Sequence, residues 1–260
     1  MGLRLERAVL SLLRAPTVDL TVLDVREPWP GFRRIRFAAP ELIGRVSLHP
    51  GIWLRLWLPS GESVVQRGYT ITQVDLDEQT FAVDFVLHQP DGVATAWARR
   101  ATVGDQLDAT LYAGTPFTFA DPQPPGYLLV GDTASLPAIN EIIRAATDLL
   151  AVRVVLVAAH EHDQAAQVAG NSAADVQVNW VDAPAAETAG AVLETFNQLG
   201  DLSGWHFWVA LEQSATKQVR AEIKARWSPG RHELKAQAYW IRGRSMGTVV
   251  KDSASSNESH

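Results

Sequence analysis

Four consecutive residues bring together a cation, an aromatic ring and a hydroxyl: Arg67-Gly68-Tyr69-Thr70. In a β-strand, Arg67 and Tyr69 would face one side and Thr70 would face the other. A flavin nucleotide needs a cation at its phosphate, an aromatic ring beside its ring system and hydrogen bonds at its edge, and this stretch could supply all three. The alternative is a surface strand whose Arg and Tyr form a cross-strand pair, which so short a motif does not exclude.

A second polar group follows an apolar stretch, where His88 precedes the turn Asp91-Gly92 and then Thr95. The turn is expected to lead into a helix over 94–101. Because the first N–H groups of a helix are unpaired and carry a partial positive charge, they can bind a phosphate. Thr95 would add a hydroxyl to that contact and His88 would flank it. The alternative is an ordinary strand end followed by a turn.

A third candidate lies in the second half of the chain, where Gly131-Asp132-Thr133 is expected between a buried strand and a helix. Open α/β sheets bind ligands at the carboxyl ends of their strands, so these residues could contact a nucleotide. The single glycine is not the dinucleotide fingerprint. A turn containing Glu212 follows a later strand at the equivalent place. The alternative is an ordinary βα turn in which Asp or Ser caps the helix.

The elements that must position these groups change character along the chain. Between 18 and 112, short apolar stretches of period two alternate with Pro- and Gly-containing turns, which predicts a small antiparallel β-barrel. After the Pro-rich linker 121–126, strands alternate with helices, which predicts a parallel sheet covered on both faces. The sequence therefore predicts two domains, a β-barrel at 1–120 and an α/β nucleotide-binding domain at 121–246, followed by a mobile tail at 247–260.

Composition excludes several classes of function. The chain has 260 residues, a net charge of -6 and no cysteine, so thiol catalysis, Cys-ligated zinc and iron–sulfur clusters are excluded and no global charge draws it to nucleic acid. The cytoplasm is the default expectation.

Charges interrupt the apolar residues of 3–13, which predicts a short amphipathic helix packed on the protein rather than a membrane span. The cluster His160-Glu161-His162-Asp163 lacks a further fixed ligand nearby, which favours a solvated loop over a metal site.

Taken together, these stretches resemble the siderophore-interacting protein family, FAD-containing ferric-siderophore reductases within the ferredoxin-reductase-like flavoproteins. The resemblance covers most of the chain. It is carried by short motifs in a characteristic order: Arg67-Gly68-Tyr69-Thr70, Asp84-Phe85-Val86-Leu87-His88, Gly92, Ala94, Thr95 and Trp97-Ala98, Gly104-Asp105, Leu129-Val130-Gly131-Asp132 with Thr133 and Leu136-Pro137-Ala138-Ile139, and Tyr239-Trp240-Ile241-Arg242-Gly243.

The resemblance implies an FAD in the barrel domain, NADH or NADPH as the electron donor at the second domain, and a ferric siderophore as substrate. Hydride transfer to FAD would be followed by single-electron reduction of the bound Fe(III), and Fe(II) would leave the chelator. The residues implied for FAD are Arg67, Gly68, Tyr69, Thr70, His88, Gly92, Ala94, Thr95 and Trp240. Those implied for the nicotinamide side are Gly131, Asp132, Thr133 and Glu212. The cations expected to hold an anionic siderophore are Arg242, Arg244 and Lys251.

Two departures from the family pattern are visible. The chain has Ala113-Gly114-Thr115-Pro116 where the family has a Gly-Pro pair, and Leu211 where the family has a glycine. A leucine at this position would hinder close approach of a dinucleotide, so a ferredoxin is an alternative donor. Two other functions stay open: a siderophore- or flavin-binding module with little turnover, and a general NAD(P)H:flavin or ferredoxin reductase.

Overall fold

A computed structural model describes residues 17–43, 48–61, 63–111, 117–146, 150–170 and 174–243. The predicted N-terminal helix, the predicted tail, the 113–116 loop, Arg244 and Lys251 lie outside the described residues. Within the described parts of the chain, no helix has the length and apolar character needed to cross a membrane.

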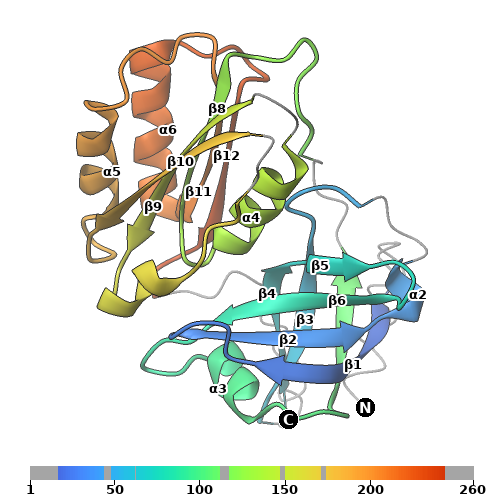
Figure 1. Ribbon diagram of the computed structural model, residues 1–260. Helices are drawn as coiled ribbons and strands as arrows, with labels where there is room; N and C mark the ends of the chain where they lie inside the picture. Colours follow the sequence, from blue (N-terminus) through green and yellow to red (C-terminus); the bar gives the residue numbers. More distant parts are fainter. Residues whose placement is uncertain are drawn as a thin grey trace, which may run out of the picture.

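The first domain is an antiparallel sheet of seven strands that curves into a half-barrel (Figure 1). Its strands are β1 (Thr17–Arg26), β2 (Phe32–Ala38), β3 (Trp53–Ser60), β4 (Ser63–Thr70), β5 (Thr72–Asp75), β6 (Thr80–Val86) and β7 (Gln106–Leu111). The strand order is β4-β3-β7-β1-β2-β6-β5. In β3 alternate residues face the interior, where Leu54, Leu56 and Leu58 are fully buried. The period-two pattern of the sequence therefore marks the inner face correctly.

Two short helices accompany the barrel, α2 (Pro40–Ile43) and α3 (Val93–Arg100). Helix α3 is anchored by Trp97, which is 4% exposed and whose ring lies 6.4 Å from that of Phe37 and 5.6 Å from that of Phe85. The basic residues of α3 lie in its last turn, where the helix dipole favours positive charge. The packing of Trp97 thus holds the first turn of α3 in place against the barrel.

The second domain is a parallel sheet of five strands with helices on both faces (Figure 1). Its elements are β8 (Gly126–Asp132), α4 (Leu136–Ala145), β9 (Ala151–Ala158), the 3-10 helix η1 (Glu161–Ala165), β10 (Asp175–Asp182), α5 (Thr188–Phe196), β11 (His206–Glu212), α6 (Gln213–Trp227) and β12 (Leu234–Trp240). Helix α4 covers the face toward the barrel, and α5 and α6 cover the other. All seven residues of β8 are buried, as expected for a central parallel strand.

The strand order is β10-β9-β8-β11-β12. From β8 the chain first adds β9 and β10 on one side, and it then returns to add β11 and β12 on the other side of β8. At such a switch point the connections leave toward opposite faces and open a crevice at the carboxyl ends of the strands. Asp132 ends β8, Glu212 ends β11 and Trp240 ends β12, and Glu212 is paired with Trp240 in the sheet register. The topology therefore gathers these three residues at one edge of the sheet.

The two domains touch along an apolar contact. Phe32 of the barrel is 1% exposed and belongs to the core that α4 forms with the sheet. Gly31, at a φ of 78°, lies so close to the ring of His162 that a Cβ there would come within 2.5 Å of Nε2. A side chain at position 31 would thus force the barrel and η1 apart.

The segment 160–163 was expected to be a solvated loop; His160, Glu161 and His162 are exposed, but residues 161–163 form the first part of the 3-10 helix η1 rather than a loop. Asp163 is 2% exposed, and its Oδ2 accepts hydrogen bonds from the backbone N–H groups of Ala159 (2.8 Å) and His160 (2.9 Å). The carboxylate therefore orders the turn that presents His162 to the barrel. No group of three or more His, Asp or Glu suited to a metal ion occurs among the described residues.

Candidate functional site

Strand β4 carries the Arg67-Gly68-Tyr69-Thr70 motif along the edge of the half-barrel. The Tyr69 ring lies 4.5 Å from that of Phe85, and burial raises the pKa of the Tyr69 hydroxyl while the nearby Arg67 charge opposes the shift. The electrostatic contact agrees with the expectation that Arg67 and Tyr69 share a face. Arg67 is half-buried, and its Nη1 donates to the backbone oxygen of Gln66 at 2.8 Å.

Thr70 connects the two domains. It is 6% exposed at the end of β4, and its side chain is hydrogen-bonded to the hydroxyl of Tyr239 in β12. Burial raises the pKa of Tyr239 to about 12; the hydrogen bond to Thr70 opposes this shift and the charge of Asp132 adds to it. The Tyr239 ring packs edge-on against Trp208 at 5.9 Å. A barrel strand and the last strand of the sheet therefore meet at one buried polar contact.

Asp132 forms a network at the end of β8. Its Oδ2 accepts a hydrogen bond from Trp240 Nε1 at 2.7 Å, and its Oδ1 accepts from the N–H groups of Ala134 (3.1 Å) and Ser135 (3.2 Å). The residue is 9% exposed; burial raises its pKa, and these hydrogen bonds oppose the shift. The carboxylate thus orders the turn between β8 and α4 and fixes the Trp240 ring, while Thr133 beside it is half-buried.

Gly131 is required by the close packing of α4 on β8. A Cβ at this position would collide with Ser135 Oγ and would lie 2.7 Å from Ile139 Cδ1, both on the α4 side of the strand. This explains why a glycine stands there without the remainder of a dinucleotide fingerprint. Its function in this structure is to admit the helix.

Glu212 caps the start of α6 with its side chain. Its Oε2 accepts from the N–H groups of Ser214 (2.5 Å) and Ala215 (3.2 Å), and its Oε1 accepts from the Arg242 N–H at 3.5 Å. The neighbouring Leu211 is fully buried in the core under α6. The expectation that its side chain obstructs a dinucleotide is therefore wrong, because the side chain lies inside the domain.

The start of α3 has no side-chain cap, so the backbone N–H groups of its first turn remain available to a ligand. His88 lies beside it: its Nδ1 is 2.8 Å from the Pro90 oxygen, and a Cβ on Gly92 would lie 3.5 Å from its ring. Since a carbonyl oxygen only accepts, Nδ1 carries the proton and Nε2 is left as an acceptor when the ring is neutral. Thr95 is 2% exposed and its hydroxyl donates to the Val86 oxygen at 3.5 Å, so the side chain faces inward.

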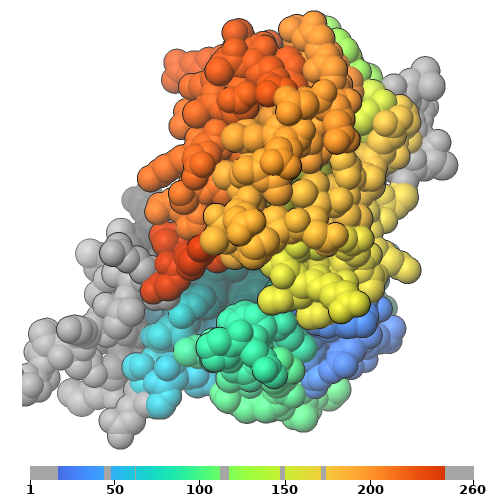
Figure 2. All heavy atoms as spheres, turned by 90° about the vertical axis from the view of Figure 1, so that its left-hand side faces the viewer, coloured from blue at the N-terminus to red at the C-terminus, as the bar shows by residue number. Residues whose placement is uncertain are grey.

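The surface is hollowed between the domains where these groups meet. Figure 2 shows a recess below the red end of β12 and above the teal helix α3, with the cyan strands of the barrel behind it. An uncapped helix start and the Arg67–Tyr69 face are what a flavin dinucleotide requires, so the residues present fit FAD.

The structure brings Thr70, Asp132, Glu212 and Trp240 together at one domain boundary. It adds Tyr239, which sequence reasoning placed in a motif without assigning it a role. Arg242 is exposed next to Glu212, and its guanidinium donates to the Ala185 oxygen.

Family models match both domains. A model described as "Siderophore-interacting FAD-binding domain" matches residues 52–111, and one described as "Siderophore-interacting protein" matches residues 124–243. Together they cover more than half of the chain.

Curated relatives include longer proteins. The chain is 37% identical over 249 residues to the "Mycobactin import ATP-binding/permease protein IrtA" of Mycolicibacterium thermoresistibile, covering 94% of this chain and 27% of that protein. It is 32% identical over 252 residues to the protein of the same name from Mycobacterium tuberculosis, covering 95% and 29%. The chain thus spans less than a third of the length of these relatives.

Solved structures share the two-domain fold. A siderophore utilization protein from T. fusca superposes with a TM-score of 0.77 at 23% identity, over 89% of this chain and 95% of that one. The siderophore-interacting protein SipS from Aeromonas hydrophila gives 0.75 at 23% identity, over 89% and 94%. The ferredoxin reductase in carbazole 1,9a-dioxygenase gives 0.62 at 14% identity, over 87% and 70%. With a half-barrel that matches the FAD-binding model and a parallel-sheet domain that matches the second model, the chain belongs to the siderophore-interacting protein family and has a ferredoxin-reductase-like fold.

Proposed function

We propose that this chain is an FAD-dependent reductase that transfers electrons to the Fe(III) of a ferric siderophore and so releases Fe(II). The observation that carries the proposal is the meeting of β4 with the carboxyl ends of β8 and β12, marked by the Thr70–Tyr239 hydrogen bond. A flavin bound at this meeting point would face both domains. The family models support the FAD and the siderophore class of substrate.

The chain's own residues divide the work of holding FAD. The N–H groups at Gly92, Ala94 and Thr95 suit the pyrophosphate, since α3 has no side-chain cap and Gly92 has no side chain that would block the approach. Arg67 and Tyr69 supply a positive charge and a ring from one face of β4. The bound FAD supplies the redox chemistry, accepting two electrons and passing them on singly. Asp132 holds the Trp240 ring at the upper rim of the recess.

The donor side is shaped by two carboxylates. A nicotinamide ring from NADH or NADPH would approach Gly131, Asp132, Thr133 and Glu212. However, Glu212 already caps α6 and Asp132 lies in the turn before α4, so a pyrophosphate would meet a carboxylate near both helix starts. This arrangement favours a donor that does not place a pyrophosphate there, such as a reduced ferredoxin.

Of the three cations expected to hold the siderophore, only Arg242 lies among the described residues. Arg242 is exposed next to Glu212, where it could attract an anionic ferric chelate. Arg244 and Lys251 are proposed to add to this attraction. Reduction weakens the hold of the chelator because siderophores bind Fe(II) poorly, so the product ion leaves.

The test begins with an absorbance spectrum of the purified chain, with FAD added if the protein is colourless. Under anaerobic conditions, the flavin is then mixed separately with NADH, NADPH and reduced ferredoxin, and bleaching is followed. The reduced protein is finally mixed with a ferric siderophore in the presence of a coloured Fe(II) chelator. The proposal expects bleaching by at least one donor and Fe(II) formation. A chain that cannot retain FAD would refute it.

A second candidate is a flavin- or siderophore-binding module with little turnover, and the carboxylates of Asp132 before α4 and of Glu212 at the start of α6 favour it. It predicts FAD binding without bleaching by any of the three donors. A third, a general NAD(P)H:flavin or ferredoxin reductase, predicts that generic electron acceptors are reduced as fast as ferric chelates. The same set of measurements therefore separates the three functions.

A further inference from the structure

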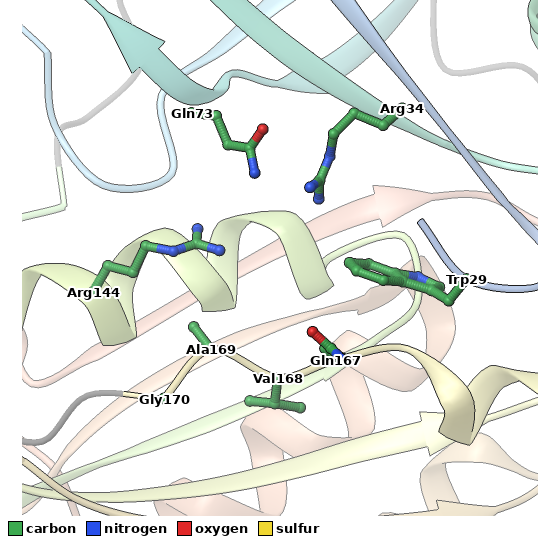
Figure 3. A pocket seen from close by; sticks show the side chains of 8 residues that line it. All are labelled: Trp29, Arg34, Gln73, Arg144, Gln167, Val168, Ala169 and Gly170. Atoms are coloured by element: carbon green, nitrogen blue, oxygen red, sulfur yellow. The ribbon is translucent and has the colours of Figure 1, made fainter. Parts of the chain in front are cut away.

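A second cavity lies between the domains, away from the residues that fit FAD. It has a volume of about 300 Å³ (Figure 3). The barrel contributes Trp29, Arg34 and Gln73, and the α/β domain contributes Arg144 and the segment 167–170. None of the described residues assigned to the flavin, the donor or the siderophore lines it.

The lining carries positive charge and hydrogen-bond donors. Figure 3 shows the polar ends of Arg34, Gln73 and Arg144 directed into the same space. Among the described residues that line the cavity none is acidic, although each of the two arginines is paired with a carboxylate beside it. Each arginine side chain is fixed by a carboxylate. Arg34 Nε and Nη2 donate to Asp84 at 2.6 and 2.8 Å, and Arg144 Nη1 donates to Glu141 at 2.6 Å. A guanidinium has five N–H donors, so both retain donors for a ligand.

The walls are already ordered. The carbonyl of Gln167 and the N–H of Ala169 are bound by the side chain of Asn140, at 3.1 and 2.7 Å, and Asn140 is 4% exposed. The Arg34 guanidinium lies 5.3 Å from the Trp29 ring centroid. The Trp29 Nε1–H is buried and has no hydrogen-bond partner among the described residues. Preplaced groups lose little conformational freedom when a ligand binds.

Gln73, which lines the same cavity, has a constrained backbone conformation. Its φ is 49°, in the left-handed region that residues other than glycine seldom adopt. Such backbone conformations persist where the surroundings enforce them, and they occur often at ligand sites. Here the conformation accompanies an amide side chain that points into the cavity.

We propose that this cavity binds a small polyanion, either a polycarboxylate or a phosphate, which is held by a guanidinium from each domain. A ligand in this position would bridge Arg34 of the half-barrel and Arg144 of α4. A monoanion would satisfy only one of these two cations. The inference goes beyond the reductase function and does not depend on it, because it involves none of the flavin-side residues.

The test is isothermal titration of the purified full chain with citrate, inorganic phosphate and acetate, measured both with and without bound FAD. Arg144→Gln removes one cation at a half-exposed position and spares the buried Arg34–Asp84 pair. Arg226→Gln is the matched control, since Arg226 lies in the last turn of α6 and pairs with Glu222 as Arg144 pairs with Glu141.

We expect citrate or phosphate to bind the wild type and to bind the Arg144→Gln variant about tenfold more weakly, as for the loss of one charge-assisted hydrogen bond. Arg226→Gln should leave the affinity unchanged, and acetate should bind more weakly than either polyanion. Binding of citrate alone identifies a polycarboxylate site, and binding of phosphate identifies a phosphate site. Three results would overturn the proposal: no binding of either polyanion, equal affinity in the Arg144→Gln variant, or acetate binding as tightly as the polyanions.

Discussion

The hydrogen bond between Thr70 and Tyr239 is expected to couple the stabilities of the two domains. Tyr239→Phe removes one hydroxyl and leaves the Thr70 hydroxyl, in a residue only 6% exposed, without its partner. A net hydrogen bond contributes about 0.5–1.5 kcal/mol, and a buried polar group left unpaired costs about 1–3 kcal/mol. We therefore expect the free energy of unfolding to fall by about 1–2 kcal/mol.

The partner variant makes the expectation specific. Thr70→Val removes the other hydroxyl and should cost a similar amount, because it leaves the buried Tyr239 hydroxyl unpaired. The double variant leaves no unpaired hydroxyl, so its loss should be smaller than the sum of the two single losses by about 1 kcal/mol.

The assay is urea unfolding of the four proteins, followed by tryptophan fluorescence. Losses that add within about 0.3 kcal/mol would show that the two hydroxyls do not interact, and the reasoning would fail. A Tyr239→Phe variant as stable as the wild type would refute it as well.

Three further changes have expected outcomes. Gly131→Ala should lower the free energy of unfolding by about 1–3 kcal/mol, because a Cβ there collides with α4. The control is Gly190→Ala, in open space within α5, which should raise the free energy of unfolding by about 0.5–1 kcal/mol in the same urea assay. The pKa of Tyr239 is raised from 10.0 to about 12, so its contribution to the free energy of unfolding is complete below pH 10 and is lost as the pH rises toward 12. Across this window the free energy of unfolding of the wild type should fall by about 1.4 kcal/mol per pH unit more than that of Tyr239→Phe. Arg67→Ala should lower the flavin content of the purified protein more than Arg242→Ala does, and equal absorbance ratios in the two variants would contradict the place given to Arg67.

Much of the fold could be predicted because its patterns are local. The alternation in Leu54-Arg55-Leu56-Trp57-Leu58 marks the inner face of β3, and the apolar period of α4 marks its buried side. The Pro-rich linker 121–126 follows β7, which ends at Leu111, and leads into β8, which begins at Gly126. These features depend on side-chain spacing within one element, which a sequence displays directly.

The site was less accessible, because its chemistry depends on contacts between elements far apart in the chain. Asp132 and Glu212 were expected at the nicotinamide, and this stays a prediction; the structure adds that Glu212 caps α6 and that Asp132 orders the turn before α4. Leu211 was expected to obstruct a nucleotide, but the direction of its side chain is set by the sheet register.

The interdomain cavity could not have been found from the sequence. Arg34 and Arg144 lie on different domains, and nothing in their spacing indicates that their side chains point into a common space. His162 likewise stood in a cluster that suggested metal chemistry, and only the tertiary structure shows it packed on Gly31.

The position of Tyr239 on β12 has a consequence for the order of assembly. During synthesis the half-barrel leaves the ribosome first, and β12 is the last strand of the described chain to emerge. Until then Thr70 lacks its buried partner, and the end of β8 lacks the Trp240 indole that Asp132 binds. The recess between the domains is therefore completed only once β12 has been synthesised, so that a barrel made before β12 and the folded pair of domains would present different surfaces to a flavin.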